Sequence, residues 1–207
     1  MNAIKLYRHP LSGHSHRAEL FLSLLGINFQ SIDVDLLKGE HKQAAFLAKN
    51  PAGQVPVLED GNTTVTDSNA ILVYLAHAFD PAGNWYPRDP VLAAEVTRFL
   101  SIAAGPVAFG PAAARLVKVF GAGLDHDKAK EIAAGILAVL DAHLENRQWL
   151  GGDVQTIADV ANYAYIAHAP EGEVSLLEYP HLRNWLARVE SLSGFVPMQP
   201  SAVGLAA

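Results

Sequence analysis

The chain has 207 residues, of which half are hydrophobic and 17% are charged, so it can bury a core and is not a disordered protein. Its formal net charge of −6 argues against a general attraction to nucleic acid or to an anionic membrane surface. It contains no cysteine, which excludes disulfides, thiolate metal sites and a catalytic cysteine.

The first part of the chain alternates short strands and helices in the order β-α-β-α-β-β-α, which predicts a small α/β unit. The predicted strands cover 4–8, 29–34, 55–58 and 63–66, the last two as a hairpin. The predicted helices cover 18–25, 43–49 and 70–79. Gly26 is placed to end the first helix, and Pro51 to end the second.

Residues 80–90 contain three prolines and one glycine and break this pattern. We therefore predict a domain at 1–79, a linker at 80–90 and a second, all-helical domain at 91–207. The predicted helices of the second domain cover 91–104, 111–120, 128–146, 156–167 and 182–192. The tail from Phe195 is expected to be irregular. Thr156 and Asp159 have the spacing of a capping box, which we interpret as structural.

The segment 8–17 connects the first strand to the first helix, the usual place for a ligand in an open α/β sheet. Ser12 and Ser15 lie in it. Either serine can cap the helix, donate a hydrogen bond to a ligand, or do both, and position alone does not separate these roles.

Three further segments have both a structural and a functional interpretation. Pro56 begins a strand, and a cis bond there would leave the backbone of Val55 free for an extended ligand, although trans is the default isomer. Asp67 and Ser68 precede a helix, where Ser68 is a natural N-cap and the helix start favours a carboxylate. Lys42, next to His41, is either a solvated side chain or a clamp for a second carboxylate.

Other classes of function lack their motifs. There is no Gly-x-Gly-x-x-Gly, no phosphate-binding P-loop and no Gly-x-Ser-x-Gly, and His9, His14 and His16 lack carboxylate partners at metal-site spacing. No apolar run reaches the roughly 18 residues of a membrane span. The N-terminus leaves no room for a signal peptide, so we expect a cytoplasmic protein without metal, nucleic acid or membrane partners.

Taken together, these motifs resemble those of the cytosolic glutathione transferases, in particular bacterial and plant phi-type members with a serine active site. The matching residues are Leu6-Tyr7, Pro10-Leu11-Ser12, Arg17, Glu40-His41-Lys42, Phe46-Leu47, Asn50-Pro51, Gly53 to Leu58, Asp60-Gly61, Asp67 to Ile71, Tyr74-Leu75 and Thr156 to Asp159. The resemblance covers essentially the whole chain. It implies a thioredoxin-like N-terminal domain, an all-α C-terminal domain, glutathione as co-substrate and a homodimer.

The resemblance also implies roles for individual residues. Ser12 would be the catalytic hydroxyl, preferred to Ser15 because Ser15 is better placed to begin the helix. The other implied glutathione contacts are His41 and Lys42 at the glycine carboxylate, Gln54 and Val55 before a cis Pro56, and Asp67 and Ser68 at the γ-glutamyl end. Two positions depart from the family pattern: Asp67 replaces the usual glutamate, and Asn69 replaces the arginine of phi-like members.

Position between the two domains suggests walls for an electrophile pocket: Pro10, Leu11, Ala103, Val107, Phe109 and Tyr163. Each of these residues could equally belong to the core. The leading prediction is a glutathione transferase of a detoxification type, which converts the thiol of glutathione to a thiolate for attack on a hydrophobic electrophile. The alternatives are a non-catalytic ligand-binding or regulatory protein of this fold and a dedicated glutathione-dependent isomerase or ether-cleaving enzyme.

Overall fold

The computed structural model describes residues 4–204, so 1–3 and 205–207, which the predicted domain ranges include, lie outside the described residues. The first half of the chain forms a four-stranded sheet in the order β2-β1-β3-β4. β1 (Ile4–Arg8) runs parallel to β2 (Phe29–Asp33) and antiparallel to β3 (Val57–Asp60), and β3 runs antiparallel to β4 (Thr63–Thr66).

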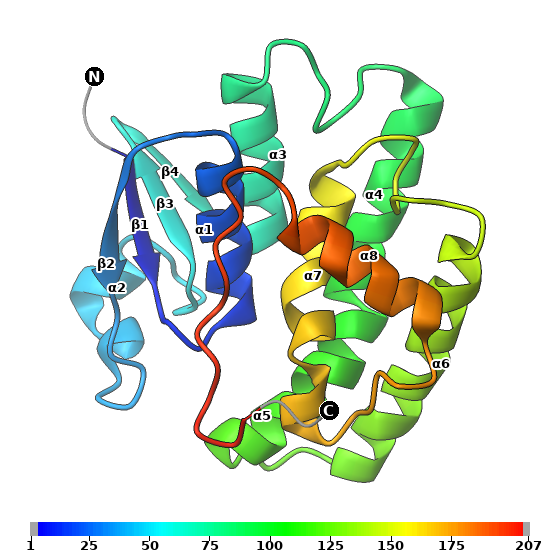
Figure 1. The fold of residues 1–207 in the computed structure, drawn as a ribbon. Coiled ribbons are helices and arrows are strands. Elements are labelled where there is room, and N and C mark those ends of the chain that lie inside the picture. Colours follow the sequence, from blue (N-terminus) through cyan, green and yellow to red (C-terminus); the bar gives the residue numbers. More distant parts are fainter. Residues whose placement is uncertain (1–3, 205–207) are drawn as a thin grey trace.

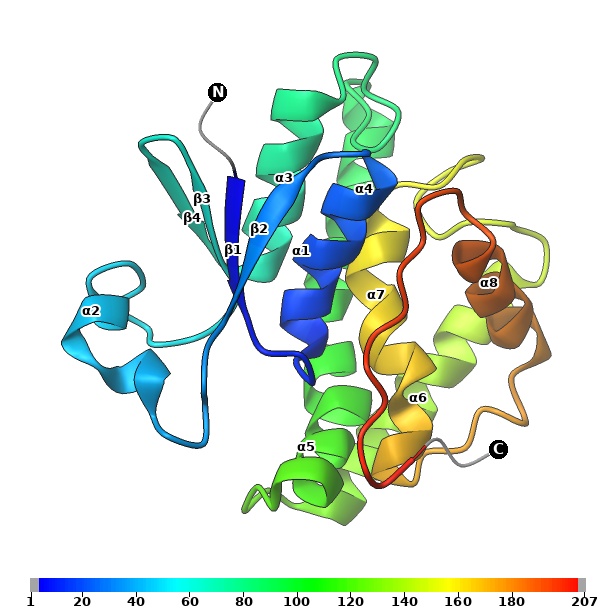
Figure 2. The same ribbon diagram turned by 60° about the vertical axis from the view of Figure 1, so that its left-hand side comes forward.

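Helices cover both faces of this sheet (Figures 1 and 2). α1 (Gly13–Leu24) and α3 (Ser68–Phe79) lie on the face toward the rest of the molecule, and the short α2 (Ala44–Leu47) lies on the opposite side, preceded by a 3-10 turn at Glu40–Lys42. Gly26, with φ +66°, follows α1 in the left-handed region, which a glycine adopts without strain. The predicted order of strands and helices is confirmed.

The second half is helical, as predicted. It comprises α4 (Pro90–Ala104), α5 (Ala113–Phe120), α6 (His126–Leu144), α7 (Ile157–Ala167) and α8 (Pro180–Glu190), with a 3-10 turn at Ala169–Gly172. Caps set the helix starts. Thr156 and Asp159 form the predicted capping box of α7. α6 begins two residues before its predicted start because the side chain of Asp125 accepts the N–H of Lys128 at 2.9 Å.

A π-helical turn at Ala108–Ala112 joins α4 to α5. Pro111 fits inside this turn, although proline is unfavourable in a regular helix. Gly110 fits because its backbone lies against α6: an added Cβ would be 2.7 Å from the backbone nitrogen of Ala133. A π turn contains one residue more than an α-helical turn. The extra residue rotates the following segment, so it changes which of its side chains face the first half.

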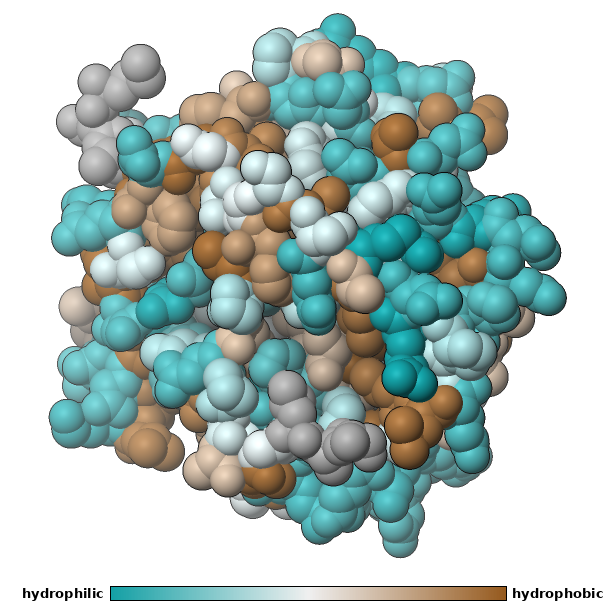
Figure 3. All heavy atoms as spheres, in the orientation of Figure 1, coloured by the Kyte–Doolittle hydropathy of each residue, from teal (hydrophilic) through white to brown (hydrophobic). Residues whose placement is uncertain are grey.

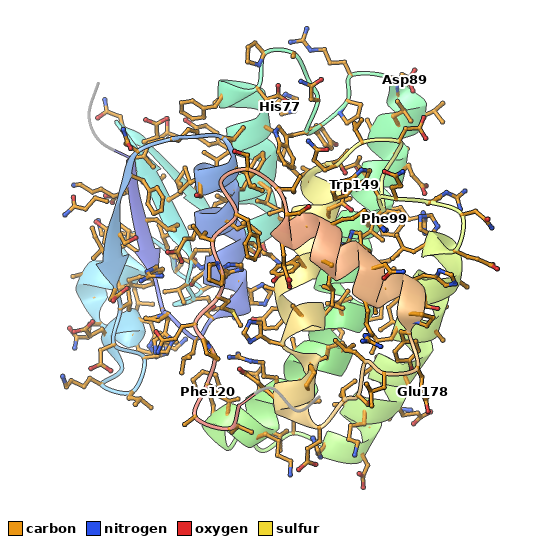
Figure 4. The ribbon with its side chains drawn as sticks, viewed as in Figure 1. His77, Asp89, Phe99, Phe120, Trp149 and Glu178 are labelled. Carbon is orange, nitrogen blue, oxygen red and sulfur yellow. The ribbon has the colours of Figure 1, made fainter. Side chains whose placement is uncertain are left out.

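The continuous helical stretch Pro90–Phe120 is long and apolar enough to cross a membrane by length and composition. This differs from the expectation that no apolar run reaches that length, because the predicted helices at 91–104 and 111–120 are continuous in the structure. In the most apolar part of the stretch, 28% is buried inside the fold. Val96, Phe99 and Ala103 of this stretch are fully buried in the core of the fold, and Figure 4 shows Phe99 inside the helical half.

The two halves share one hydrophobic core. Its buried side chains include Leu20 and Leu72 from the first half and Phe99 and Ala161 from the second. A smaller cluster of Val34, Phe46 and Val57 lies under α2. On the face shown in Figure 3, hydrophilic side chains predominate over the helical side at the right, and hydrophobic groups lie between them.

The C-terminal tail, residues 195–204, has no regular structure, as predicted, and runs along α1 and α7 (Figures 1 and 2). One contact fixes the residue before the tail and two fix the tail itself. The hydroxyl of Ser23 donates to the carbonyl of Gly194 at 2.6 Å, Nε2 of His16 lies 2.8 Å from the carbonyl of Val196, and the N–H of Ser201 donates to Glu171 at 2.8 Å. The tail therefore contacts both halves of the molecule.

Candidate active site

A cleft of about 550 Å³ lies where the start of α1, the loops around β3 and α3, and the segment 108–120 meet. All the residues that the resemblance assigned to glutathione line this one cleft: Ser12, His41, Lys42, Gln54, Val55, Pro56, Asp67 and Ser68. They come from four separate segments of the first half, which the sheet and its loops bring to one edge.

Ser12 is the N-cap of α1, and its Oγ accepts the N–H of Ser15 at 3.2 Å. The expectation that Ser15 begins the helix was wrong. Ser15 is 1% exposed, does not line the cleft, and its Oγ accepts the N–H of His9 at 3.2 Å. Because the capping bond uses Ser12 as an acceptor, its own hydroxyl proton points away from the capped N–H, toward the cleft or toward the neighbouring hydroxyl of Tyr165, at the electropositive start of the helix.

Tyr165 of α7 packs directly on this helix start. An added Cβ on Gly13 would lie 2.7 Å from Cε1 of the Tyr165 ring, so no larger residue fits there without displacing the ring. The Tyr165 hydroxyl accepts the N–H of His14 at 3.3 Å. Burial raises the pKa of Tyr165, so its hydroxyl remains protonated at neutral pH. α7 thereby fixes the position of the segment that carries Ser12.

The loop before β3 is held by Asn50. Its Nδ2 donates to the carbonyl of Gln54 at 2.8 Å, and its Oδ1 accepts the N–H of Ala52 at 3.1 Å. The Val55–Pro56 bond is cis. Among the residues that the structure describes, the backbone N–H and C=O of Val55 have no hydrogen-bond partner, so they are available to an extended ligand.

Lys42 lies against the same loop: its Nζ donates to the carbonyl of Gly53 at 3.0 Å. Gly53 has φ +59°, and an added Cβ would lie 2.8 Å from the carbonyl oxygen of His41. The glycine therefore lets the loop turn tightly against the 3-10 turn that carries His41 and Lys42. A cationic side chain is thus placed at one end of the cleft.

The opposite end of the cleft is the start of α3. The N-cap is Asp67, not Ser68 as expected: Oδ1 of Asp67 accepts the N–H groups of Asn69 and Ala70, both at 2.9 Å. Asp67 has φ +72°, an unfavourable conformation for a residue other than glycine, of the kind found at ligand sites. Asn69, at a position where phi-like members have arginine, donates to the carbonyl of Leu100 at 3.0 Å, a contact between the two halves.

Arg17 lies under this end of the cleft and is fully buried. Its Nη1 is 3.0 Å from Nδ1 of His14 and 3.2 Å from Oγ of Ser68, and its Nη2 donates to the carbonyl of Ala103 at 3.4 Å. Burial lowers the pKa of Arg17 to about 10, so it stays charged at neutral pH. Burial, together with the charge of Arg17, lowers the pKa of His14 to about 3. Neither Arg17 nor His14 was predicted to contact glutathione.

The wall from the helical half consists of one side of the π turn and of α5. Its small and apolar members are Ala108, Ala112, Leu116 and Phe120, with Tyr165 and Arg115 beside them. Of the predicted electrophile residues, the structure brings only Leu11 to this cleft. Pro10, Ala103, Val107, Phe109 and Tyr163 do not line it.

The positions of these residues have simple geometric reasons. Ala103 and Val107 are fully buried, whereas Phe109 is 64% exposed because the π turn directs it outward. Tyr163 and Tyr165 are two residues apart on α7, so they point to nearly opposite sides of the helix. The hydroxyl of Tyr163 donates to Glu190 at 2.9 Å, and its ring packs on Phe195, away from the cleft.

A buried ion pair supports this wall. Nε of Arg115 donates to Glu171, and both side chains are 1% exposed or less. Nη1 of Arg115 donates to the carbonyl of Leu11 at 2.8 Å, one residue before Ser12. Burial raises the pKa of Glu171, but the N–H of Ser201, the His168 ring and the Arg115 charge outweigh it, so the pKa is lowered. Arg115 was not predicted from the sequence, although a charged residue within an apolar helix is a pattern that could have indicated it.

The two walls touch at the mouth of the cleft, where the ring centroids of His9 and Phe120 are 6.1 Å apart. Figure 4 shows Phe120 at the end of α5, on the side toward the first half. Residues 4–204 contain no group of three or more side chains placed to hold a metal ion. Two of the clustered histidines have other partners: His14 contacts Arg17, and His16 contacts the carbonyl of Val196.

Comparison with known proteins places these features in context. Residues 2–77 match the family model described as glutathione S-transferase, N-terminal domain, and residues 118–193 match the C-terminal domain model. Glutathione S-transferase 3 of Zea mays is 32% identical, over 97% of each chain. Glutathione S-transferase theta-2 of Mus musculus is also 32% identical, over 92% of this chain and 82% of that one.

Solved structures agree. A glutathione S-transferase from Pseudomonas fluorescens superposes with a TM-score of 0.89 and 33% identity, over 95% of this chain and 99% of that one. A glutathione transferase homologue from Drosophila mojavensis, with bound glutathione, has a TM-score of 0.85 and 27% identity, over 93% and 89% of the two chains. These matches confirm the predicted thioredoxin-like first half and all-helical second half.

Proposed function

Since the chain belongs to the glutathione S-transferase family and is a transferase that uses glutathione as its co-substrate, we propose that Ser12 is the residue that stabilises the glutathione thiolate in the cleft. The observation that carries this proposal is the geometry of the helix cap. Oγ of Ser12 accepts a backbone N–H, so its hydroxyl proton is directed elsewhere, and the residue lines the cleft at the start of α1.

The chemistry needs a change in thiol acidity. A free thiol has a pKa of about 8.5, so only about 3% is thiolate at pH 7. Lowering the pKa by about two units makes the anion dominant and requires about 2.7 kcal/mol of preferential stabilisation. A hydrogen bond from Ser12 and the electropositive end of α1 both favour the anion. Because the chain has no cysteine, the reacting sulfur is that of glutathione itself.

The rest of the tripeptide fits the polar edge of the first half. We place the cysteinyl backbone on the unpaired N–H and C=O of Val55, next to the cis Pro56 and Gln54. The glycine carboxylate then reaches His41 and Lys42, and the γ-glutamyl end reaches Asp67 and Ser68 at the start of α3. Each assignment pairs a charge or an unpaired backbone group with the complementary group of the ligand.

The electrophile binds against the second wall in this proposal. Ala108, Ala112, Leu116 and Phe120 offer an apolar surface next to Ser12, which suits a hydrophobic electrophile. The thiolate sulfur forms a bond to the electrophilic carbon, and the leaving group departs with the electron pair of its bond, while the thiol proton has already passed to solvent. The relatives are transferases, which does not favour a non-catalytic binding protein.

Three further assignments belong to this proposal. The chain works as a homodimer, as its family resemblance implies, and in the cytoplasm. Its domain boundary lies at 80–90, where residues 80–89 form an irregular segment between α3 and α4 and Pro90 is the first residue of α4. Light scattering of the purified protein would test the dimer, and a monomeric mass at micromolar concentration would refute it.

An ultraviolet titration of bound glutathione tests the role of Ser12. In the parent protein, the absorbance of the thiolate should develop with a midpoint about two pH units below that of free glutathione. In Ser12→Ala the midpoint should return toward 8.5, while calorimetry still detects binding. A parent protein that binds glutathione without any shift of its thiol pKa would refute thiolate activation in this cleft, and an unchanged midpoint in the variant would refute the role of Ser12.

A further inference from the structure

His14 offers the cleft a donor that the proposed glutathione contacts do not include. The residue lies two positions after Ser12, in the first turn of α1, and its ring lines the cleft. The ring packs edge-on against Tyr165, with centroids 5.0 Å apart and planes at 74°. Its Nδ1 has two neighbours, Nη1 of Arg17 at 3.0 Å and Oγ of Ser68 at 3.1 Å. Nε2 has no hydrogen-bond partner among the described residues.

Arg17 determines where the proton of His14 sits. A guanidinium group has five N–H donors and no acceptor, so the ring nitrogen beside it must be the unprotonated one. Nδ1 of His14 is therefore the acceptor, and the proton of the neutral ring is on Nε2. The ring stays neutral at physiological pH because burial and Arg17 hold its pKa at about 3. His14 thus presents a fixed N–H to the cleft.

The hydroxyl of Ser68 belongs to the same cluster. Its Oγ accepts from Arg17 at 3.2 Å and lies 3.1 Å from Nδ1 of His14, whose single lone pair already accepts from Arg17. Oδ1 of Asp67 already accepts the N–H groups of Asn69 and Ala70. The N–H donors left at this end of the cleft are the backbone amide of Ser68 and Nε2 of His14.

Arg17 places a buried positive charge behind this end of the cleft. Among the residues that the structure describes, no carboxylate lies within ion-pair distance of Arg17, and the carboxylate of Asp67 acts on it from farther away. Arg17 polarises the ring of His14 through Nδ1 and so makes its Nε2–H a stronger donor.

We propose that Nε2–H of His14 donates a hydrogen bond to the γ-glutamyl carboxylate of glutathione, beside the backbone amide of Ser68. His14 then acts as a binding residue specific for that end of the tripeptide, with Arg17 as its positioning residue. This inference rests on the proposed function, because it takes the γ-glutamyl end to lie at the start of α3.

The variant His14→Asn separates the donor from the structural contact. The amide oxygen of asparagine can replace Nδ1 as the acceptor for Arg17 and Ser68, but no atom reaches the position of Nε2. We expect the Kd for glutathione to rise about tenfold, because a hydrogen bond to a charged group is lost. The melting temperature should change by no more than a few degrees. His77→Asn, on an exposed residue at the far end of α3 (Figure 4), is the matched control and should leave the Kd unchanged.

Two ligand analogues locate the effect. S-Methylglutathione keeps the γ-glutamyl carboxylate but has no ionisable thiol, and the tenfold penalty of His14→Asn should persist with it. Glutathione with that carboxylate converted to a carboxamide should bind parent and variant within about twofold of each other. A penalty that persists with the carboxamide, or one that vanishes with S-methylglutathione, would place His14 at another part of the ligand and overturn the proposal.

Nitrogen NMR of the parent protein provides a measurement that needs no variant. The His14 ring should show a proton on Nε2 between pH 5 and 8, and the resonance of that proton should shift when S-methylglutathione binds. A proton on Nδ1, or a resonance that glutathione leaves unmoved, would refute the proposal. If the parent protein binds no glutathione by calorimetry, the proposed function itself fails, and the two failures are thereby distinguished.

Discussion

The two walls of the cleft place their functional groups by different means. The wall from the first half uses helix starts and one tight loop: Ser12 caps α1, Asp67 caps α3, and Asn50 holds the loop at Val55. The wall from the helical half uses one side of a helical stretch, on which Leu116 and its apolar neighbours point at the cleft. The first wall offers polar atoms in fixed positions, and the second offers apolar surface.

This difference indicates which wall keeps its geometry when residues elsewhere in the chain are substituted. A capping group is set mainly by its neighbours within three or four residues, and the start of α1 is tied to the helical half by its contacts with Tyr165 and Arg115. The direction of a side chain on the second wall depends on the π turn and on the packing of Gly110 against α6. Small changes in that packing would alter the electrophile surface while leaving the polar wall in place. The four predictions below test that separation.

The largest effect is expected where the second wall is anchored. Glu171→Gln leaves the charge of Arg115 buried without its counter-ion, so the free energy of unfolding should fall by about 3–5 kcal/mol. Urea denaturation measures this. Glu173→Gln is the control, because Glu173 pairs with Lys118 at the surface, where solvent screens the pair and its loss should leave the stability almost unchanged. Equal stability of the two variants would contradict an anchoring role for the buried pair.

The next effect concerns chemistry on the polar wall. Ser12→Ala should lower kcat with an activated aryl halide by about 10²–10³-fold, the usual effect of removing one hydrogen-bond donor to a reacting anion. The lost cap should also reduce stability by about 1 kcal/mol. Ser12→Thr retains the hydroxyl and should retain most of the activity. If the alanine variant turned over at the parent rate, Ser12 would have no part in the reaction.

Lowering the pH should destabilise the folded protein because two histidines of α1 are buried. The folded state holds the pKa of His14 at about 3 and that of His16 at about 4, mainly by burial, whereas both have the ordinary value of 6.5 when unfolded. The unfolded chain therefore binds protons first as the pH falls below 6.5. Stability is fully present only well above pH 6.5, and from pH 7.5 to 5.5 it should fall by about 1.4 kcal/mol for each histidine, of which about 1 kcal/mol is lost below pH 6.5.

Urea denaturation at pH 7.5, 6.5 and 5.5 measures this loss. His14→Asn should make the loss between pH 7.5 and 5.5 smaller by about 1.4 kcal/mol, the contribution of that one histidine. Burial also lowers the pKa values of His9, His143 and His168, which adds to the loss in the same direction. A stability that stays constant down to pH 5.5 would show that His14 and His16 are protonated without cost.

The smallest effect sharpens the comparison of the walls. Leu116→Ala removes apolar surface from the second wall, so kcat/KM for a hydrophobic electrophile should fall about fivefold, which corresponds to about 1 kcal/mol. The Kd for glutathione should not change. Leu124→Ala is the control, because Leu124 is exposed and does not line the cleft. A loss of glutathione affinity in Leu116→Ala would mean that the two walls are not separate.

The sequence predicted the polar wall better than the apolar one for a physical reason. Ser12, Asp67 and Ser68 are polar residues at helix starts, and both their type and their position are visible in a short window of sequence. Their detailed roles were less visible: the N-cap of α3 is Asp67 instead of Ser68, and α1 begins at Ser12 instead of Ser15. Those assignments depend on contacts that form only in the folded protein: Arg17 donates to the hydroxyl of Ser68, and the backbone N–H of His9 donates to the hydroxyl of Ser15.

The apolar wall could not be predicted in the same way. A π turn changes the helical count, so Phe109 points to solvent while Ala108 and Ala112 face the cleft. Arg115 depends on Glu171, more than fifty residues away, and no local pattern marks that pair. For the fold, local periodicity predicted the order of strands and helices, but the pairing of β1 with both β2 and β3 is non-local.

The path of the C-terminal tail limits how this protein can recombine with its relatives. A chimera cut at 80–90 would take the first half from this chain and the helical half, tail included, from another. The foreign tail would then have to match His16 and Ser23 of α1, which in this chain contact Val196 and Gly194. Sequence exchange within the family is therefore expected to succeed when these two tail contacts are inherited together with α1, and not when the crossover separates them.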